Sequence, residues 1–110
     1  MEAFDDDIRR HLVHLEVERR LAPNTLTMYR DAFRRLQSFA TAQPVALRAV
    51  QPHHVRRWAA QLNMQGLAPR SIAIQLSAWR GLFRWLGRDG PVALNPVDGV
   101  PAPRAPKPQP

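Results

Sequence analysis

Arginines are the residues of this sequence whose types and spacing point most directly to chemistry. Four polar residues recur at intervals of three and four, at Ser77, Arg80, Arg84 and Arg88, with no acidic residue between them. This spacing places them along one side of a helix. On such a surface, arginines commonly pair with acidic residues three or four positions away, and none is present here. Unpaired guanidinium groups bind phosphate bidentately. The pattern therefore predicts a surface that binds a polyanion, with an ordinary solvated basic face as the alternative.

The charge of the chain is distributed unevenly. Residues 1–18 hold six acidic residues and two arginines, whereas the remaining 92 residues hold fourteen cations and three acids, a net charge of +11 for that part. Fifteen of the sixteen cations are arginine. A strongly basic body with a preference for arginine is typical of a nucleic-acid partner.

A phrase that occurs twice adds further candidates: LAPNTLTMYR begins at Leu21 and LAPRSIAIQL begins at Leu67. In each copy a proline precedes a helical pattern, and the Leu-Ala-Pro residues are interpreted as corner residues. We expect Asn24 or Thr25 to cap the first helix and Arg70 or Ser71 to begin the second, where backbone N–H groups bind phosphate. Gln75 has the side chain to read adenine. The predicted nucleic-acid contacts are Asn24, Thr25, Thr27, Arg30, Arg34, Arg70, Ser71, Gln75, Ser77, Arg80 and Arg84.

The elements that position these residues are four helices, because apolar residues recur every three to four positions in four stretches. The first helix follows three aspartates and runs to about residue 20, and the second follows Pro23 and includes residues 26–39. The third runs from Gln51-Pro52 to Gly66, and the fourth follows Pro69 and includes residues 72–86. No segment alternates as a strand does. We expect an all-α, compact domain of two packed helical hairpins over residues 1–89, followed by an extended, Pro-rich linker over residues 90–110.

Several classes of protein and site are not expected. The chain has no cysteine, no apolar run of about 20 residues and an acidic start, which together indicate a cytoplasmic protein without a membrane partner. The glycine patterns of nucleotide-binding loops are absent, and no cofactor is expected. The histidines and clustered aspartates are interpreted as structural or surface residues rather than metal ligands: His11, His14, His53, His54, Asp5, Asp6 and Asp7.

The segment LVHLEVERRLAPNTLTMYRDAFRRLQSF, together with QGLAPRSIAIQLSAWRGLFRWL and NPVDGVPAPRAPKPQP, resembles the amino-terminal core-binding domain of tyrosine recombinases of the XerC type. The most specific pieces are Glu18-Arg19, the phrase from Ser71 to Arg80, and Asn95-Pro96 before the Pro-rich end. The resemblance implies a four-helix, SAM-like domain that forms half of a C-shaped clamp on DNA. It also implies that the second and fourth helices face the DNA.

The resemblance places DNA-facing positions at Asn24, Thr25, Arg30, Arg70, Ser71, Gln75 and Arg80. The chain departs from the family at Ile74 and Gln75, where two basic residues are common. The family's catalytic arginines, lysine, histidines and tyrosine lie in a separate carboxy-terminal domain. Here Tyr29 is the only tyrosine and falls in an apolar stripe, so this chain is expected to be non-catalytic.

The partners that the resemblance implies are double-stranded DNA of a recombination-site arm, a XerD-like recombinase and other protomers of a DNA-assembled tetramer. The corresponding process is resolution of chromosome dimers at dif-type sites. Two alternatives remain open on the sequence: the core-binding domain of a phage or integron integrase, and a helical adaptor whose arginines meet acidic proteins.

Overall fold

A computed structural model describes residues 4–88 and 95–102, and the remaining residues are not discussed. Its elements, in chain order, are α1 (Asp6–Val17), α2 (Pro23–Ala42), the short 3-10 helix η1 (Leu47–Ala49), α3 (Pro52–Met64) and α4 (Pro69–Gly87). The described residues contain no strand. The predicted all-α, four-helix architecture is confirmed.

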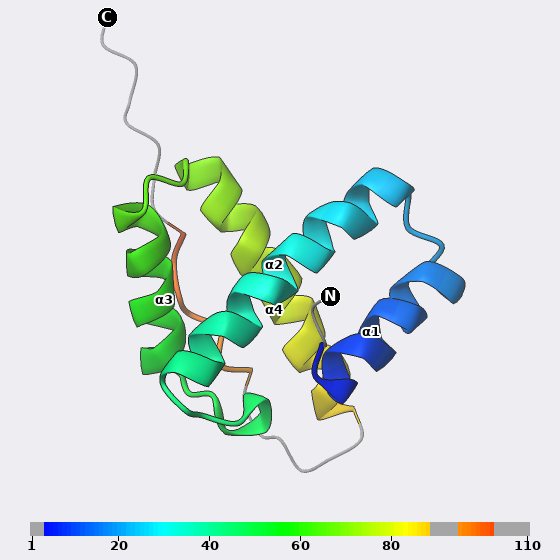
Figure 1. Ribbon diagram of the computed structural model, residues 1–110, viewed down its shortest axis with the longest axis horizontal. Helices are drawn as coiled ribbons and strands as arrows, with labels where there is room; N and C mark the ends of the chain where they lie inside the picture. The colour runs from blue at the N-terminus through cyan, green and yellow to red at the C-terminus, as the bar shows by residue number, and fades with distance from the viewer. Residues whose placement is uncertain (1–3, 89–94, 103–110) are drawn as a thin grey trace, which may run out of the picture.

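The helices α2 and α4 cross at the centre of the molecule and form its largest contact (Figure 1). Helix α1 packs against both of them, and α3 packs against α4. The amino-terminal ends of α2 and α4 lie on the same side of the molecule, at the top of Figure 1. The crossing therefore presents the starts of both helices to one side.

The core forms where the apolar stripes of the four helices meet. Trp79 of α4 is fully buried, and its indole Nε1 donates a hydrogen bond to the carbonyl oxygen of Ala32 in α2 at 2.8 Å. The Trp58 ring of α3 meets the Trp79 ring edge-on and stacks on Phe39 of α2, at centroid separations of 6.3 and 5.7 Å. Edge-on and stacked pairs add specific attraction to the burial of these large rings. This aromatic cluster joins three of the four helices.

The start of α1 agrees with the prediction from the sequence, but its end does not. The Asp5 side chain caps the helix by accepting a hydrogen bond from the Asp7 backbone N–H at 2.8 Å. The Arg48 guanidinium, which bonds to the Asp7 carboxylate at 2.9 Å, lowers the pKa of that group. The helix ends at Val17 rather than near Arg20, because Arg20 adopts a left-handed conformation (φ 51°) that no α-helix can continue.

The segment of residues 95–102 packs on the helices instead of leaving them. We expected the domain to end at residue 89, yet Val97 and Val100 are buried. Asn95 anchors the segment to α4, since its Nδ2 donates to the carbonyl oxygen of Arg80 at 3.0 Å. Two valines within a Pro-rich stretch supply enough apolar surface to join the core. The rest of the expected linker, residues 90–94 and 103–110, lies outside the described residues.

Among residues 4–88 and 95–102, no helix combines the length and apolar character that crossing a membrane requires.

Candidate nucleic-acid interface

The helices α2 and α4 begin with the same local structure. Pro23 and Pro69 are the first helical residues, and the alanine before each is the N-cap, with φ and ψ near −61° and 148° in α2 and −63° and 148° in α4. Neither N-cap makes a side-chain hydrogen bond. The prediction that Asn24 or Thr25 caps α2, and that α4 begins at residue 70 or 71, is therefore wrong. Proline fixes its own φ and forces the preceding residue to be extended, so it determines the start itself.

The predicted contact residues of α2 lie at or near the surface, but the polar groups of three of them have partners. Asn24 is exposed and Thr25 is half-buried. The Thr27 hydroxyl donates to the carbonyl oxygen of Pro23 at 3.0 Å. Arg30 lies 3.8 Å from the Glu16 carboxylate of α1, and Arg34 lies 3.6 Å from that of Asp31. A phosphate that bound either arginine would have to compete with these carboxylates.

The outer side of α4 has a different charge environment. Arg70, Ser77 and Arg84 are exposed and lie seven residues apart, close to two helical turns, so they follow one side of the helix. Ser71 is exposed beside Arg70. Helix α4 contains no acidic residue. Within the part of the chain that the structure describes, no carboxylate lies within ion-pair distance of Arg70 or Arg84. We call Arg70, Ser77 and Arg84 the α4 ridge.

Arg80 does not lie on an acid-free ridge as predicted. Its side chain is 35% exposed, and its Nε lies 3.4 Å from the Asp98 carboxylate. Asp98 belongs to the segment that was expected to be an extended linker, so nothing in the sequence pattern placed this acid beside Arg80. Arg84 and Arg88, the next two residues of the expected ridge, are exposed, and no ion pair joins either to a carboxylate of the described residues.

Gln75 is not available to read a base. It is only 6% exposed, because it faces the α2–α4 contact, where its Nε2 donates to the Asp31 carboxylate at 3.4 Å. Its Oε1 is buried and has no hydrogen-bond partner among the described residues. The prediction that Gln75 contacts adenine is corrected: an apolar-stripe position one turn from Ile72 faces inward whatever its side chain.

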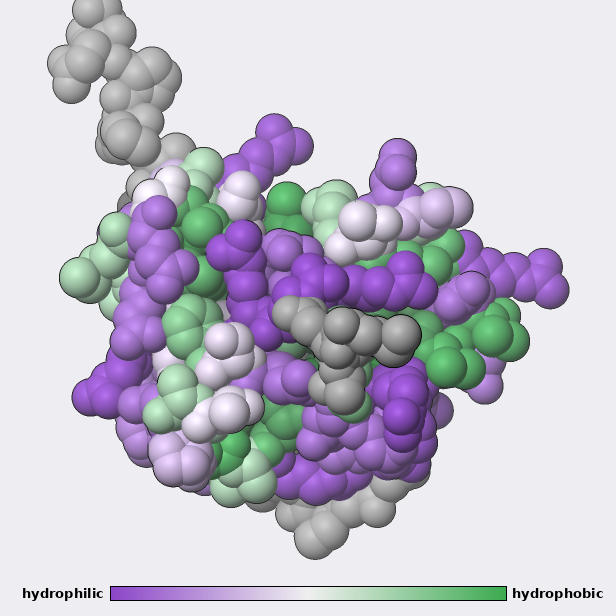
Figure 2. All heavy atoms as spheres, viewed as in Figure 1, coloured by the Kyte–Doolittle hydropathy of each residue, from purple (hydrophilic) through white to green (hydrophobic). Residues whose placement is uncertain are grey.

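The sequence analysis missed a notch of about 220 Å³ between α2 and α4. Met28, Arg35 and Ile74 are among its lining residues, and Met28 is 43% exposed. The only signal in the sequence was a methionine at an outward position of α2. Figure 2 shows that mainly hydrophilic residues surround scattered apolar side chains on the face of α2 that it presents.

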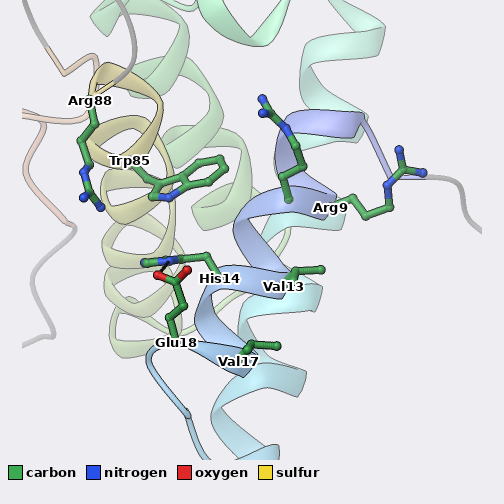
Figure 3. Close-up of a pocket in the computed structure, with 8 residues that line it drawn as sticks. Arg9, Val13, His14, Val17, Glu18, Trp85 and Arg88 are labelled. Carbon is green, nitrogen blue, oxygen red and sulfur yellow. Dashed lines mark hydrogen bonds and ion pairs between the residues drawn. The ribbon is translucent and has the colours of Figure 1, made fainter.

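A larger pocket of about 570 Å³ lies between α1 and the end of α4. Figure 3 shows Trp85 of α4 opposite His14 of α1, whose Nδ1 lies 2.9 Å from the Glu18 carboxylate. Beside this pocket, His11 is buried against Trp85 and Phe33. Burial, together with the charges of His14 and Arg19, lowers the pKa of His11 to about 4. The His11 imidazole is therefore neutral at pH 7, which suits an aromatic core position.

The tyrosine of this chain, Tyr29, belongs to the core rather than to the surface of α2. Tyr29 is partly buried in the core, with its ring edge-on to that of Phe33 at 6.1 Å, as its apolar stripe predicted. Across residues 4–88 and 95–102, no three histidine, aspartate or glutamate side chains lie close enough together to hold a metal ion. The arrangement of exposed arginine and serine on α4 is suited to binding an anion.

Comparison with known proteins agrees with this architecture. The chain is 48% identical over 103 residues to tyrosine recombinase XerC of Ralstonia pickettii (strain 12J), covering 91% of this chain and 31% of that protein. It is 40% identical over 109 residues to tyrosine recombinase XerC of Salmonella typhi, covering 96% of this chain and 35% of that protein. The chain thus spans about a third of the length of these curated relatives. No solved structure matches it.

The family model for the N-terminal SAM-like domain of phage integrases matches residues 8–90, which include α2, α3 and α4 and all but the first two residues of α1. The match covers well over half of the chain. This chain therefore belongs to the phage integrase N-terminal SAM-like domain family, and among its members it resembles the XerC-type tyrosine recombinases.

Proposed function

We propose that this chain is the non-catalytic DNA-binding module of a site-specific tyrosine recombinase. The α4 ridge carries the proposal, because Arg70 and Arg84 are exposed on an acid-free helix and have no carboxylate partner among the described residues. Phosphate is the anion that arginine and serine side chains on a helix surface bind in DNA complexes. The excess of cations after residue 18 attracts a duplex to the same body.

The starts of α2 and α4 extend the proposed contact. Both helices begin on the same side of the molecule (Figure 1), and each offers free backbone N–H groups in its first turn. Asn24 and Ser71 are exposed there, with Thr25 half-buried beside Asn24. In this arrangement the duplex contacts both helix starts and the α4 ridge. Arg30, Arg34 and Arg80 contribute mainly long-range attraction, because each has a carboxylate partner.

The relatives extend this proposal to a biological role. XerC-type similarity supports a share in chromosome dimer resolution at dif-type sites in the cytoplasm, with a XerD-like recombinase and other protomers assembled as a tetramer on DNA. This module would supply affinity and register on one arm of the site. Strand cleavage would belong to the part of such a recombinase that this chain does not span.

Fluorescence anisotropy with labelled duplexes, at two salt concentrations, tests the proposal. If the module makes roughly 3 to 6 phosphate contacts, a fourfold rise in salt lowers its affinity by at least about 40-fold. An acidic protein of matched net charge serves as the competitor that an adaptor would prefer. Binding to DNA that is undetectable at low salt, or insensitive to salt, would contradict the proposal.

A further inference from the structure

The notch between α2 and α4 lies beside the proposed DNA contact and is partly apolar. Three of its lining residues are Met28 from α2, Leu67 from the corner before α4, and Ile74 from α4. Ile74 lies four residues after Arg70 and three before Ser77, so it belongs to the same stretch of α4 as the ridge. A duplex that contacts the ridge therefore passes over the notch.

Three of the polar side chains in the notch bond to one another, and a fourth, Ser71, has an exposed hydroxyl group at its edge. The Asp31 carboxylate accepts hydrogen bonds from Arg35 Nε at 3.1 Å and from Gln75 Nε2 at 3.4 Å. The remaining polar atom of Gln75, its Oε1, is buried and has no surface to offer a ligand. Recognition by hydrogen bonds to Gln75 would require breaking its bond to Asp31, which joins α4 to α2. The apolar surface available to a ligand is therefore that of Met28, Leu67 and Ile74, with the Ser71 hydroxyl beside it.

A partly apolar notch beside the exposed Arg70 restricts the choice of occupant. The one apolar group on the major-groove edges of the four base pairs is the 5-methyl group of thymine. We propose that the notch receives this methyl group, so that Met28 and Ile74 determine a preference for thymine at one position of the bound duplex. The inference rests on the proposed function, because the α4 ridge must first hold the duplex. It also gives a role to Ile74, a position at which this chain departs from the family.

The volume and charge of the site favour this occupant over a side chain of another protein. A notch of about 220 Å³ is smaller than the clefts of roughly 300 Å³ or more that enclose drug-sized ligands, and it suits a single small group. Arg35 on its wall is paired with Asp31, whereas Arg70, one turn before Ile74 on α4, has no carboxylate partner among the described residues and favours an occupant attached to a polyanion.

Replacing thymine by deoxyuridine tests the inference, since this change removes only the methyl group. The 110-residue chain is first used to select preferred duplexes from a random-sequence library. Each thymine of the best duplex is then replaced singly by deoxyuridine, and anisotropy gives the affinities. We expect one position at which the replacement lowers affinity by about fourfold, the effect of burying one methyl group.

The variants Met28→Ala and Ile74→Ala connect that position to the notch. In the double variant, the difference between thymine and deoxyuridine at that position should disappear, while the dependence of binding on salt is retained. Met64→Ala is the matched control, because Met64 is 83% exposed at the end of α3, outside the notch. Circular dichroism melting verifies that every variant remains folded.

Two results would overturn the inference. One is equal affinity for thymine and deoxyuridine at every position, and the other is thymine discrimination that persists in the folded double variant. If binding still weakens with salt, either result refutes thymine recognition by the notch and leaves the proposed function unaffected. Absence of salt-sensitive binding to any duplex refutes the proposed function as well.

Discussion

The two Leu-Ala-Pro corners have nearly the same backbone but lead into helices with different surfaces. At both corners a residue with positive φ, Arg20 or Gly66, ends the turn of the preceding helix. The leucine N–H that follows donates back to that helix, to Leu15 O in the first corner and to Leu62 O in the second, at 3.1 Å in each. Local sequence thus produces the same corner twice.

The helices beyond the corners differ in what surrounds their arginines. On α2, carboxylates from α1 and from α2 itself lie next to Arg30 and Arg34. On α4, Arg70 and Arg84 have no such neighbour among the described residues, and only Arg80 is paired, by the segment of residues 95–102. A repeated phrase therefore repeats the corner without repeating the function, because charge neutralisation depends on distant parts of the chain.

Helices α2 and α4 share the buried contact where they cross, and Trp79→Phe would disrupt the packing of both helices there. The substitution removes the hydrogen bond to Ala32 and leaves a small cavity, so we expect the free energy of unfolding to fall by about 2 to 3 kcal/mol. Trp85→Phe is the matched control at a half-buried site of the same helix, with a smaller expected loss. Urea denaturation measures both. Equal losses would show that Trp79 is not the main link between the two helices.

His11 allows the same crossing to be weakened by pH, because it contacts Phe33 of α2 and Trp85 of α4. Its pKa of about 4 in the folded protein lies below the value of 6.5 for a free histidine, so below pH 6.5 the unfolded state binds more protons. Its contribution to stability should therefore fall by about 2 kcal/mol between pH 7 and pH 5, and should not change further well below pH 4.

The variant His11→Leu tests this origin of the pH dependence. Both ring nitrogens of His11 are buried without a hydrogen-bond partner among the described residues, so we also expect the variant to be more stable at pH 7 by about 1 kcal/mol. Denaturation at both pH values should show a smaller decrease for His11→Leu than for the unchanged protein. His53→Leu, at an exposed site on α3, is the control and should retain the original decrease.

The two helix surfaces can be compared by charge-matched double variants. Arg70→Ala with Arg84→Ala should weaken duplex binding by about tenfold and lower the salt slope by about two, because two phosphate contacts are lost. Arg30→Ala with Arg34→Ala removes the same charge but should weaken binding by only about threefold, through long-range attraction alone. Anisotropy titrations measure the affinities, and melting temperatures verify folding. The reverse order would place the main contact on α2.

The corners themselves should respond with opposite signs. Gly66 has a φ of 93°, which alanine adopts with strain, so Gly66→Ala should lower the free energy of unfolding by about 1 kcal/mol. Arg20→Gly should raise it by about 0.5 kcal/mol, since glycine accepts the left-handed conformation more easily than arginine. Thermal denaturation of the two variants provides the comparison. Changes of the same sign would mean that the corners are not equivalent.

Helix boundaries were predictable where a single residue determines them. Pro52 and Gly66 mark the start and end of α3 as expected, with Gln51 as N-cap. Pro23 and Pro69 mark the true starts of α2 and α4. The N-cap of α2 is Ala22, two or three residues before the expected Asn24 or Thr25, because proline determines a helix start more strongly than a polar cap does. The inward orientation of Gln75 was also predictable from the helical period, because Gln75 adjoins the apolar stripe that includes the buried Leu76.

The sequence by itself determined the fold class, the four helices, the two corners and the acid-free character of α4. Each of these depends on residues within about one or two turns of one another, through proline geometry, helical period and local charge. The tertiary structure alone decided which arginines remain without a carboxylate and where an apolar notch opens between α2 and α4. Those outcomes depend on contacts such as that of Arg80 with Asp98 and that of Arg30 with Glu16, which only the packing of distant segments brings together.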